Sequence, residues 1–193
     1  MRRAPAAGLS LIEVLFALSL TLAAAGAAVP ALIEINRAIR LRSAASFVAG
    51  YLQRARLEAI RRCQAVGVRF RAGDADWLMG TYADGNGNGL RNADIVNGID
   101  LMLDEELAFG ARAASVRISR LSGVPDVNGA TGGEAVRFGA SGIASFSSDG
   151  SSSSGSIYLT DGRTQIAVTV TPATGRVRLR KWEQRTRTWS QIR

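Results

Sequence analysis

The sequence has 193 residues, of which 47% are hydrophobic and 21% charged, and a formal net charge of +8. These proportions are typical of one folded domain with an accessory element, and they exclude disorder throughout. The sequence contains no histidine and no nucleophile motif, which excludes histidine-based triads and histidine-ligated metals, so we do not expect an enzyme.

The first predicted element is an apolar helix. Residues 9–29 read LSLIEVLFALSLTLAAAGAAV, and Glu13 is their one charged residue. A helix of this length rises about 30 Å, which is enough to cross a bilayer. Arg2 and Arg3 precede it and favour a cytoplasmic N-terminus. Because a carboxylate in hydrocarbon costs roughly 2.5 to 3.5 kcal/mol on insertion scales, Glu13 indicates a compensating positive charge.

The residues around this glutamate carry a family resemblance. Gly8 followed by LSLIEV resembles the processing signal of type IV pilins and type II secretion pseudopilins. The resemblance implies that prepilin peptidase removes residues 1–8 and that Leu9, in place of the usual phenylalanine, becomes the N-methylated first residue. It also implies that Glu13 neutralises the N-terminal amine of a neighbouring subunit. A signal anchor that tolerates Glu13 is the alternative.

A second helical segment is predicted over residues 30–65. Pro30 ends the apolar run, at the place where pilin helices commonly carry a kink, because proline lacks the N–H and its ring disturbs one turn. Beyond it, apolar residues recur at three- and four-residue spacing, which predicts an amphipathic helix. The expected buried stripe consists of Ala45, Val48, Leu52, Ala55, Ala59 and Cys63. Cys63 is the one cysteine, and we interpret it as a small helix-face residue.

The end of this segment resembles one branch of the family. Residues 52–62, LQRARLEAIRR, are similar to the helix end of GspH/FimT proteins, with Leu57 in place of the usual serine. The resemblance implies an α+β pilin-like fold, in which a long N-terminal helix packs on an antiparallel β-sheet domain formed by residues 66–193. It also implies a structural subunit that contacts other pilins or pseudopilins and an inner-membrane assembly platform. The C-terminal domain is then periplasmic, in a type II secretion pseudopilus or a type IV pilus, and both machines stay open.

Alternating apolar and polar residues predict short strands in the remainder. They are expected over 66–70 and 76–82 and within 115–121, 134–146, 155–172 and 175–182. Asp161-Gly162 predicts a type I′ hairpin, and residues 172–175 the next turn. Residues 147–156, SSDGSSSSGS, are predicted to form a flexible surface loop.

A loop rich in asparagine and glycine is the first candidate binding site. Asp84, Asn86, Asn88 and Asp94 lie in residues 84–94, which resemble the front of an EF-hand or dockerin calcium loop. Only two carboxylates are present and Asp94 comes one position early, so any calcium affinity is expected to be weak. A turn-rich loop without metal is the alternative, and no other cofactor is expected.

The C-terminal strand is the second candidate binding site. Residues 176–193 hold seven basic residues and one acidic residue, a net charge of +6. On a strand, alternate residues share one face about 7 Å apart, a pitch that suits a phosphate backbone, and nearby tryptophans offer stacking surfaces. The residues concerned are Arg176, Arg178, Arg180 and Lys181, with Trp182 and Trp189. The segment resembles the GRxR motif that is associated with DNA binding in some FimT-type minor pilins. The alternative is an ordinary last hairpin whose arginines discourage edge-to-edge aggregation.

Overall fold

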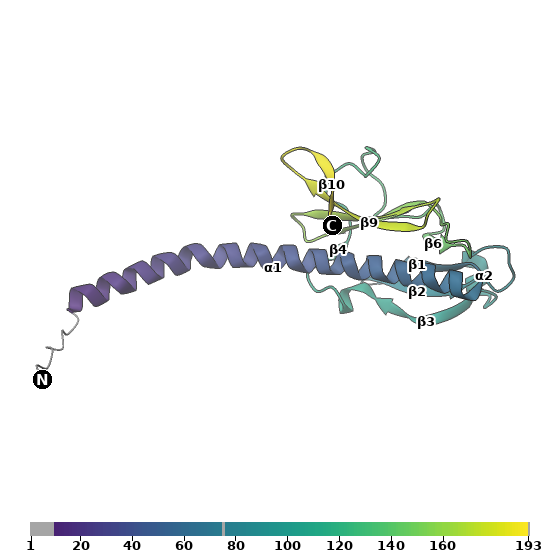
Figure 1. The fold of residues 1–193 in the computed structure, drawn as a ribbon, viewed down its shortest axis with the longest axis horizontal. Helices are drawn as coiled ribbons and strands as arrows, with labels where there is room; N and C mark the ends of the chain where they lie inside the picture. The colour runs from purple at the N-terminus through teal and green to yellow at the C-terminus, as the bar shows by residue number, and fades with distance from the viewer. Residues whose placement is uncertain (1–9, 75, 193) are drawn as a thin grey trace, which may run out of the picture. The chain divides into compact units, whose positions relative to one another are not determined.

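The computed structural model describes residues 10–74 and 76–192, which form two compact units, one up to Ala38 and one from Ile39 onward. Figure 1 shows the elements in chain order. The helices are α1 (Leu11–Arg62), α2 (Asn92–Val96) and the 3-10 helix η1 (Phe109–Ala111). The strands are β1 (Val66–Ala72), β2 (Trp77–Ala83), β3 (Leu101–Ala108), β4 (Arg117–Ile118), β5 (Val136–Arg137), β6 (Ile143–Phe146), β7 (Gly155–Thr160), β8 (Gln165–Thr171), β9 (Arg176–Glu183) and β10 (Thr188–Ile192).

Both ends of α1 have recognisable caps. The Ser10 hydroxyl accepts a hydrogen bond from the Glu13 N–H at 3.3 Å, which satisfies one of the free donors of the first turn. At the other end, Cys63 adopts a left-handed conformation with φ 53°, and the Gln64 N–H donates to the Ala59 carbonyl at 3.3 Å. This pattern closes the helix in the manner of a Schellman motif. Pro30 lies inside α1, and a kink there stays a prediction.

The second unit contains two antiparallel sheets. The first has the strand order β3-β2-β1-β6, and the second has the order β10-β9-β8-β7-β4, with β5 also paired to β7. Strands β7 to β10 follow one another as a meander, as the hairpin pattern predicts. The predicted α+β fold, with a long N-terminal helix packed on antiparallel β-structure, is therefore confirmed.

One hydrophobic core joins the C-terminal half of α1 to both sheets. The helix contributes a stripe of residues that are at most 1% exposed: Ala45, Val48, Leu52, Ala55 and Ala59. These pack in the same cluster as Phe70 of the first sheet and Ile157 of the second. The stripe is confirmed for these five positions. It is wrong for Cys63, which is exposed because the helix has already ended at Arg62.

Two local predictions differ from the structure. The β7–β8 connection contains the predicted glycine turn, but it has four residues, 161–164, since Thr160 and Gln165 form the last pair. The Asp161 carboxylate accepts hydrogen bonds from the N–H groups of Arg163 and Thr164 at 2.9 and 2.7 Å. Only Gly162 in this loop has a positive φ, whereas a type I′ turn requires two such residues.

The serine-rich segment is the other difference. Its first part is a surface turn, but Ser152 forms a bridge with Phe146, and the Ser153 hydroxyl accepts a hydrogen bond from the Ser145 N–H at 3.0 Å. Ser156 lies within β7 and is 5% exposed. The prediction of a surface loop is therefore wrong for the second half of the segment, whose hydroxyls hydrogen-bond to the strands.

Candidate functional site

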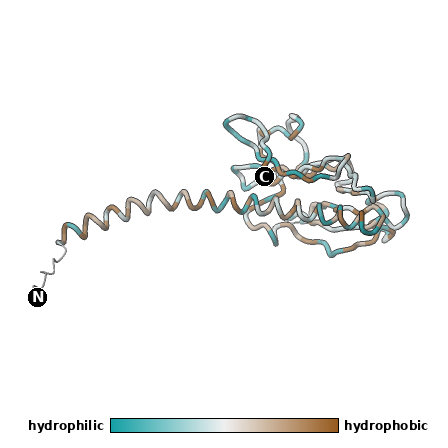
Figure 2. Tube along the Cα trace, in the orientation of Figure 1, coloured by the Kyte–Doolittle hydropathy of each residue, from teal (hydrophilic) through white to brown (hydrophobic). Residues whose placement is uncertain are grey.

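The N-terminal half of α1 is apolar and exposed on every side. All described side chains from Ser10 to Arg40 are exposed, and the large apolar ones between Leu11 and Ile35 are 48 to 78% exposed. Figure 2 shows this concentration of hydrophobic residues along the helix. By length and composition, α1 is the one helix among the described residues able to span a membrane. A helix that is apolar all round is stable in a bilayer or against other helices, and not in water.

Glu13 is the one charged residue between Leu11 and Ile33. It lies three residues after the cap Ser10, where the helix dipole favours a negative charge by about 0.3 to 1 kcal/mol. That contribution is smaller than the roughly 2.5 to 3.5 kcal/mol that insertion of a charge costs. The first turn of α1 therefore does not account for Glu13 in hydrocarbon. The predicted cleavage and methylation site, Gly8 and Leu9, lies outside the described residues.

The other polar groups of this segment are satisfied within the helix itself. The Ser19 hydroxyl donates to the Phe16 carbonyl at 2.9 Å, and the Thr21 hydroxyl donates to the Leu18 carbonyl at 2.8 Å. Such bonds let hydroxyls enter an apolar environment at little cost. Within the described part of the chain, the Glu13 carboxylate has no ion-pair partner, so it is the group in this segment that requires an external one.

The predicted basic residues of β9 divide between the two faces of the strand. Arg176, Arg178 and Arg180 share the outer face, since they pair with Thr171, Thr169 and Ala167 of β8. Arg176 is exposed, whereas Arg178 and Arg180 are half-buried. Lys181 lies on the opposite face and forms an ion pair with Glu183 at 3.2 Å. The structure therefore brings the three arginines together and separates Lys181 from them.

The two tryptophans are not free stacking platforms. Trp182 is 8% exposed, and its ring lies 5.5 Å from that of Trp189 in an edge-on arrangement. Trp189 also packs on Tyr158, at 5.9 Å between ring centroids, and its indole N–H donates to the Pro125 carbonyl at 3.2 Å. These rings pack the 119–134 connection against the outer face of the second sheet, so they are unavailable to nucleotide bases. The prediction of stacking surfaces is corrected on this point.

The asparagine- and glycine-rich loop is ordered by its own backbone. The Asp84 carboxylate is 8% exposed and accepts hydrogen bonds from the N–H groups of Asn86, Gly87 and Gly89 at 2.7 to 3.1 Å. The Asn88 amide donates to Asp94 at 3.0 Å. Calcium requires six to eight oxygen ligands. Both Asp84 oxygens accept backbone hydrogen bonds, which favours the turn-rich loop of the alternative, whereas calcium binding itself stays a prediction.

Asp100 also orders this loop, although the sequence pattern did not identify it. It is 2% exposed, and its two oxygens accept hydrogen bonds from the N–H groups of Gly85 and Arg91 at 3.2 and 3.1 Å. Within the described chain, no three acidic or thiol side chains gather where they could hold a metal ion. Aspartates that cap backbone N–H groups are a common way to order a turn.

Comparison with known proteins identifies the family from most of the second unit. The family model described as type II transport protein GspH matches residues 44–175, which is about two thirds of the chain. The chain belongs to the GspH family. GspH proteins are structural pseudopilins and not enzymes, and with its apolar N-terminal helix this GspH protein is a membrane-anchored pseudopilin of the type II secretion class. No curated protein and no solved structure matches the chain.

The GspH match covers residues 44–175 and leaves out both ends of the chain. It begins within the buried half of α1 and ends at the turn before β9. It therefore includes the core helix stripe and the asparagine- and glycine-rich loop, but it includes neither Glu13 nor the arginines of β9. The match therefore supports no particular role for Glu13 or for these arginines.

Proposed function

We propose that this GspH protein is a minor pseudopilin that prepilin peptidase cleaves after Gly8 and that is N-methylated at Leu9. The N-terminal half of α1 then lies in the core of a filament, among the corresponding helices of neighbouring subunits. The proposal is carried by the exposed apolar surface of that helix with one unpaired carboxylate, Glu13, in its first turn. An apolar helix that buries nothing in its own domain favours lipid first and partner helices afterwards.

Electrostatics supports a neighbour's N-terminal amine as the partner of Glu13. At a separation of about 4 Å and an effective dielectric constant of about 20, a pair of unit charges attracts by about 4 kcal/mol. This attraction is of the same order as the roughly 2.5 to 3.5 kcal/mol that insertion of each charge costs, so the paired carboxylate is much less costly than an unpaired one. An amine that becomes free only after cleavage would therefore stabilise the assembled state and fix the axial register between subunits.

The same proposal gives the topology of the precursor. Arg2 and Arg3 favour a cytoplasmic N-terminus, so the domain from Ile39 onward faces the periplasm. An inner-membrane assembly platform then transfers the processed chain into the filament beside other pseudopilins. The β-domain is left to contact other minor subunits or cargo.

The test compares two single substitutions in the apolar helix. Glu13→Gln removes the charge and keeps the size, and we expect the variant to enter the membrane but to be lost from sheared filaments. Thr21→Val is the matched control, because the Thr21 hydroxyl is satisfied by its own helix, and it should be incorporated normally. Incorporation of Glu13→Gln at the level of the unsubstituted protein would contradict the proposed pairing.

A DNA-uptake pilus subunit is the second candidate function. It is favoured by the common outer face of Arg176, Arg178 and Arg180, whose charge suits a phosphate backbone. All described core residues lie at or beyond Leu41, so a fragment from Arg37 onward contains the whole core. If this function holds, the fragment binds duplex DNA with an affinity that falls steeply with salt. If the chain is only a secretion subunit, Arg176→Glu with Arg178→Glu leaves secretion and assembly intact.

A further inference from the structure

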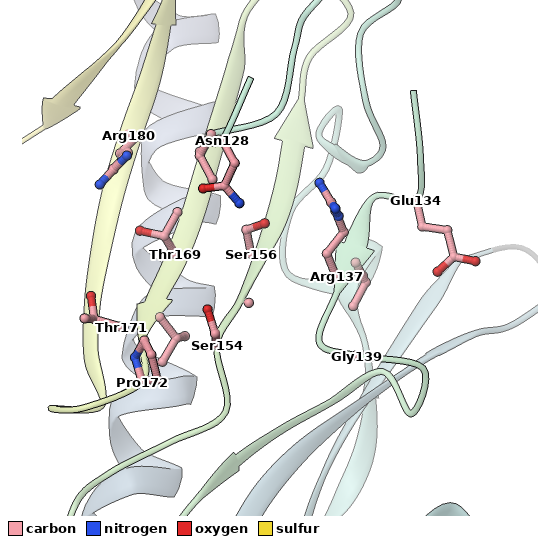
Figure 3. Close-up of a pocket in the computed structure, with 14 residues that line it drawn as sticks. Asn128, Glu134, Arg137, Gly139, Ser154, Ser156, Thr169, Thr171, Pro172 and Arg180 are labelled. Carbon is pink, nitrogen blue, oxygen red and sulfur yellow. The ribbon is translucent and has the colours of Figure 1, made fainter. Parts of the chain in front are cut away.

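The outer face of the second sheet carries a polar cleft of about 530 Å³, and of the predicted binding residues only Arg180 lines it. Figure 3 shows it beside strands β7 to β9, with Arg137 and Glu134 on the side away from Arg180. Thr169 and Ser156 form its floor, and Arg180 and Arg137 stand at opposite sides of it. Its volume is within the range of ligand-binding sites.

Arg180 supplies an available positive charge. It lies on β9 opposite Ala167, it is half-buried, and it forms no ion pair with any described residue. A guanidinium has five N–H donors and no acceptor. A half-buried guanidinium without a carboxylate partner therefore leaves strong donors available at one side of the cleft.

Arg137 supplies a second positive charge, and an ion pair with a buried aspartate holds its side chain in place. Its backbone lies in β5, paired with Ser156, and its guanidinium forms an ion pair with Asp126. Asp126 is 1% exposed and accepts hydrogen bonds from the N–H groups of Asn128 and Ala130, both at 2.8 Å. The Arg137 side chain remains 41% exposed, so part of its guanidinium group is accessible to a ligand.

The spacing of the two arginines limits the kind of ligand. Arg137 and Arg180 are separated by β7 and β8, which places their strands about 14 Å apart at 4.7 to 4.9 Å per strand. In an extended chain, residues on the same side repeat every 6 to 7 Å, or about 13 Å for two repeats. Two carboxylates of one extended segment can therefore each meet an arginine.

The other residues that line the cleft disfavour nucleotides and runs of phosphates as ligands. No aromatic residue lines the cleft, which leaves bases and sugar rings without a stacking surface. Glu134 is exposed at the rim, and it would repel a continuous run of phosphates more than separated carboxylates with neutral residues between them. The exposed hydroxyl residues Ser154 and Thr171 can donate hydrogen bonds to peptide carbonyls.

We propose that this cleft binds an extended acidic polypeptide segment, with two carboxylates four residues apart held by Arg180 and Arg137. The inference concerns a different set of residues from the apolar helix, and it holds or fails independently of the processing and assembly of the chain. Arginine and carboxylate form paired, charge-assisted hydrogen bonds, which gives the interaction geometric selectivity as well as strength.

The test uses the full-length protein in detergent and a fluorescein-labelled peptide, Gly-Glu-Thr-Glu-Thr-Glu-Gly, followed by fluorescence polarisation. The peptide with glutamine in place of glutamate should not bind. Arg180→Gln should weaken binding of the acidic peptide by about tenfold or more. Arg185→Gln is the matched control, because Arg185 is exposed in the β9–β10 turn outside the cleft, and it should change binding by less than about twofold.

A second variant separates a specific cleft from general attraction to positive charge. Ser154→Trp fills the cleft and keeps both arginines, so it should abolish binding while the unfolding midpoint is retained. The proposal is overturned if the peptide gives no saturable signal, if Arg185→Gln weakens binding as much as Arg180→Gln, or if Ser154→Trp binds normally. It is also overturned if a short DNA duplex binds more tightly than the peptide and loses that binding in Arg180→Gln.

Discussion

Truncation of Leu52 tests the core that joins α1 to both sheets. Leu52 is 0% exposed and lies in the middle of the buried helix stripe. Leu52→Ala removes three carbon atoms from a site that has no access to water, so it loses both burial and packing. Leucine-to-alanine changes at such sites cost about 2 to 5 kcal/mol. For a unit of about 155 residues this corresponds to a fall in the unfolding midpoint of roughly 10 °C.

The assay is thermal unfolding of the detergent-solubilised chain, followed by tryptophan fluorescence. Trp77 reports on the first sheet, and Trp182 and Trp189 report on the second. Leu57→Ala is the control, because Leu57 is on the same helix but is 64% exposed, and its change should stay within about 0.5 kcal/mol. The reasoning is refuted if Leu52→Ala unfolds within about 2 °C of the unsubstituted protein, or if both variants fall equally.

Three further predictions follow from local contacts. Gly155→Ala should destabilise the chain by about 1 to 3 kcal/mol, because the added carbon would overlap the Phe138 ring. Gly50 has open space around it, so Gly50→Ala should stabilise the helix by roughly 0.5 to 1 kcal/mol. Chemical denaturation measures the free energy of unfolding of both variants. A hydrogen bond from Arg71 lowers the pKa of Glu106, so this carboxylate stabilises the fold at neutral pH and loses its contribution as the pH falls through its folded-state pKa. In Glu106→Gln the free energy of unfolding should therefore depend less on pH below about pH 5. An unchanged pH dependence in this range would refute the stabilising role of the Glu106 carboxylate. We propose that the asparagine- and glycine-rich loop needs no calcium, so a chelator should leave the unfolding midpoint unchanged, and a clear fall would restore the calcium interpretation.

Sequence periodicity predicted those parts of the fold that depend on local repeats. The spacing of Ala45, Val48 and Leu52 identifies the buried helix face because a helix repeats every 3.6 residues wherever its partner lies. The same argument failed at Cys63, because the end of a helix depends on a cap and not on the period. The division of the strands into two sheets was not predictable, since alternation specifies a strand but not its neighbours.

In the candidate sites too, features that depend on local repeats were predictable and features that depend on distant segments were not. The common face of Arg176, Arg178 and Arg180 follows from strand alternation, and the structure has it. The burial of Trp182 and Trp189 does not, because it depends on a connection more than 45 residues earlier in the chain, where the Pro125 and Asp126 carbonyls accept the Trp189 N–H. The cleft between Arg137 and Arg180 was missed for the same reason, as its two sides come from distant segments.

The mass of the mature chain tests the central claim most directly. The protein is extracted from membranes of cells with an active prepilin peptidase, and its intact mass and N-terminal peptide are determined by mass spectrometry. We expect a chain that begins at Leu9 and carries an N-methyl group, since only a cleaved terminus provides the amine that pairs with Glu13 of a neighbour. A chain that retains residues 1–8 in such cells would contradict this account.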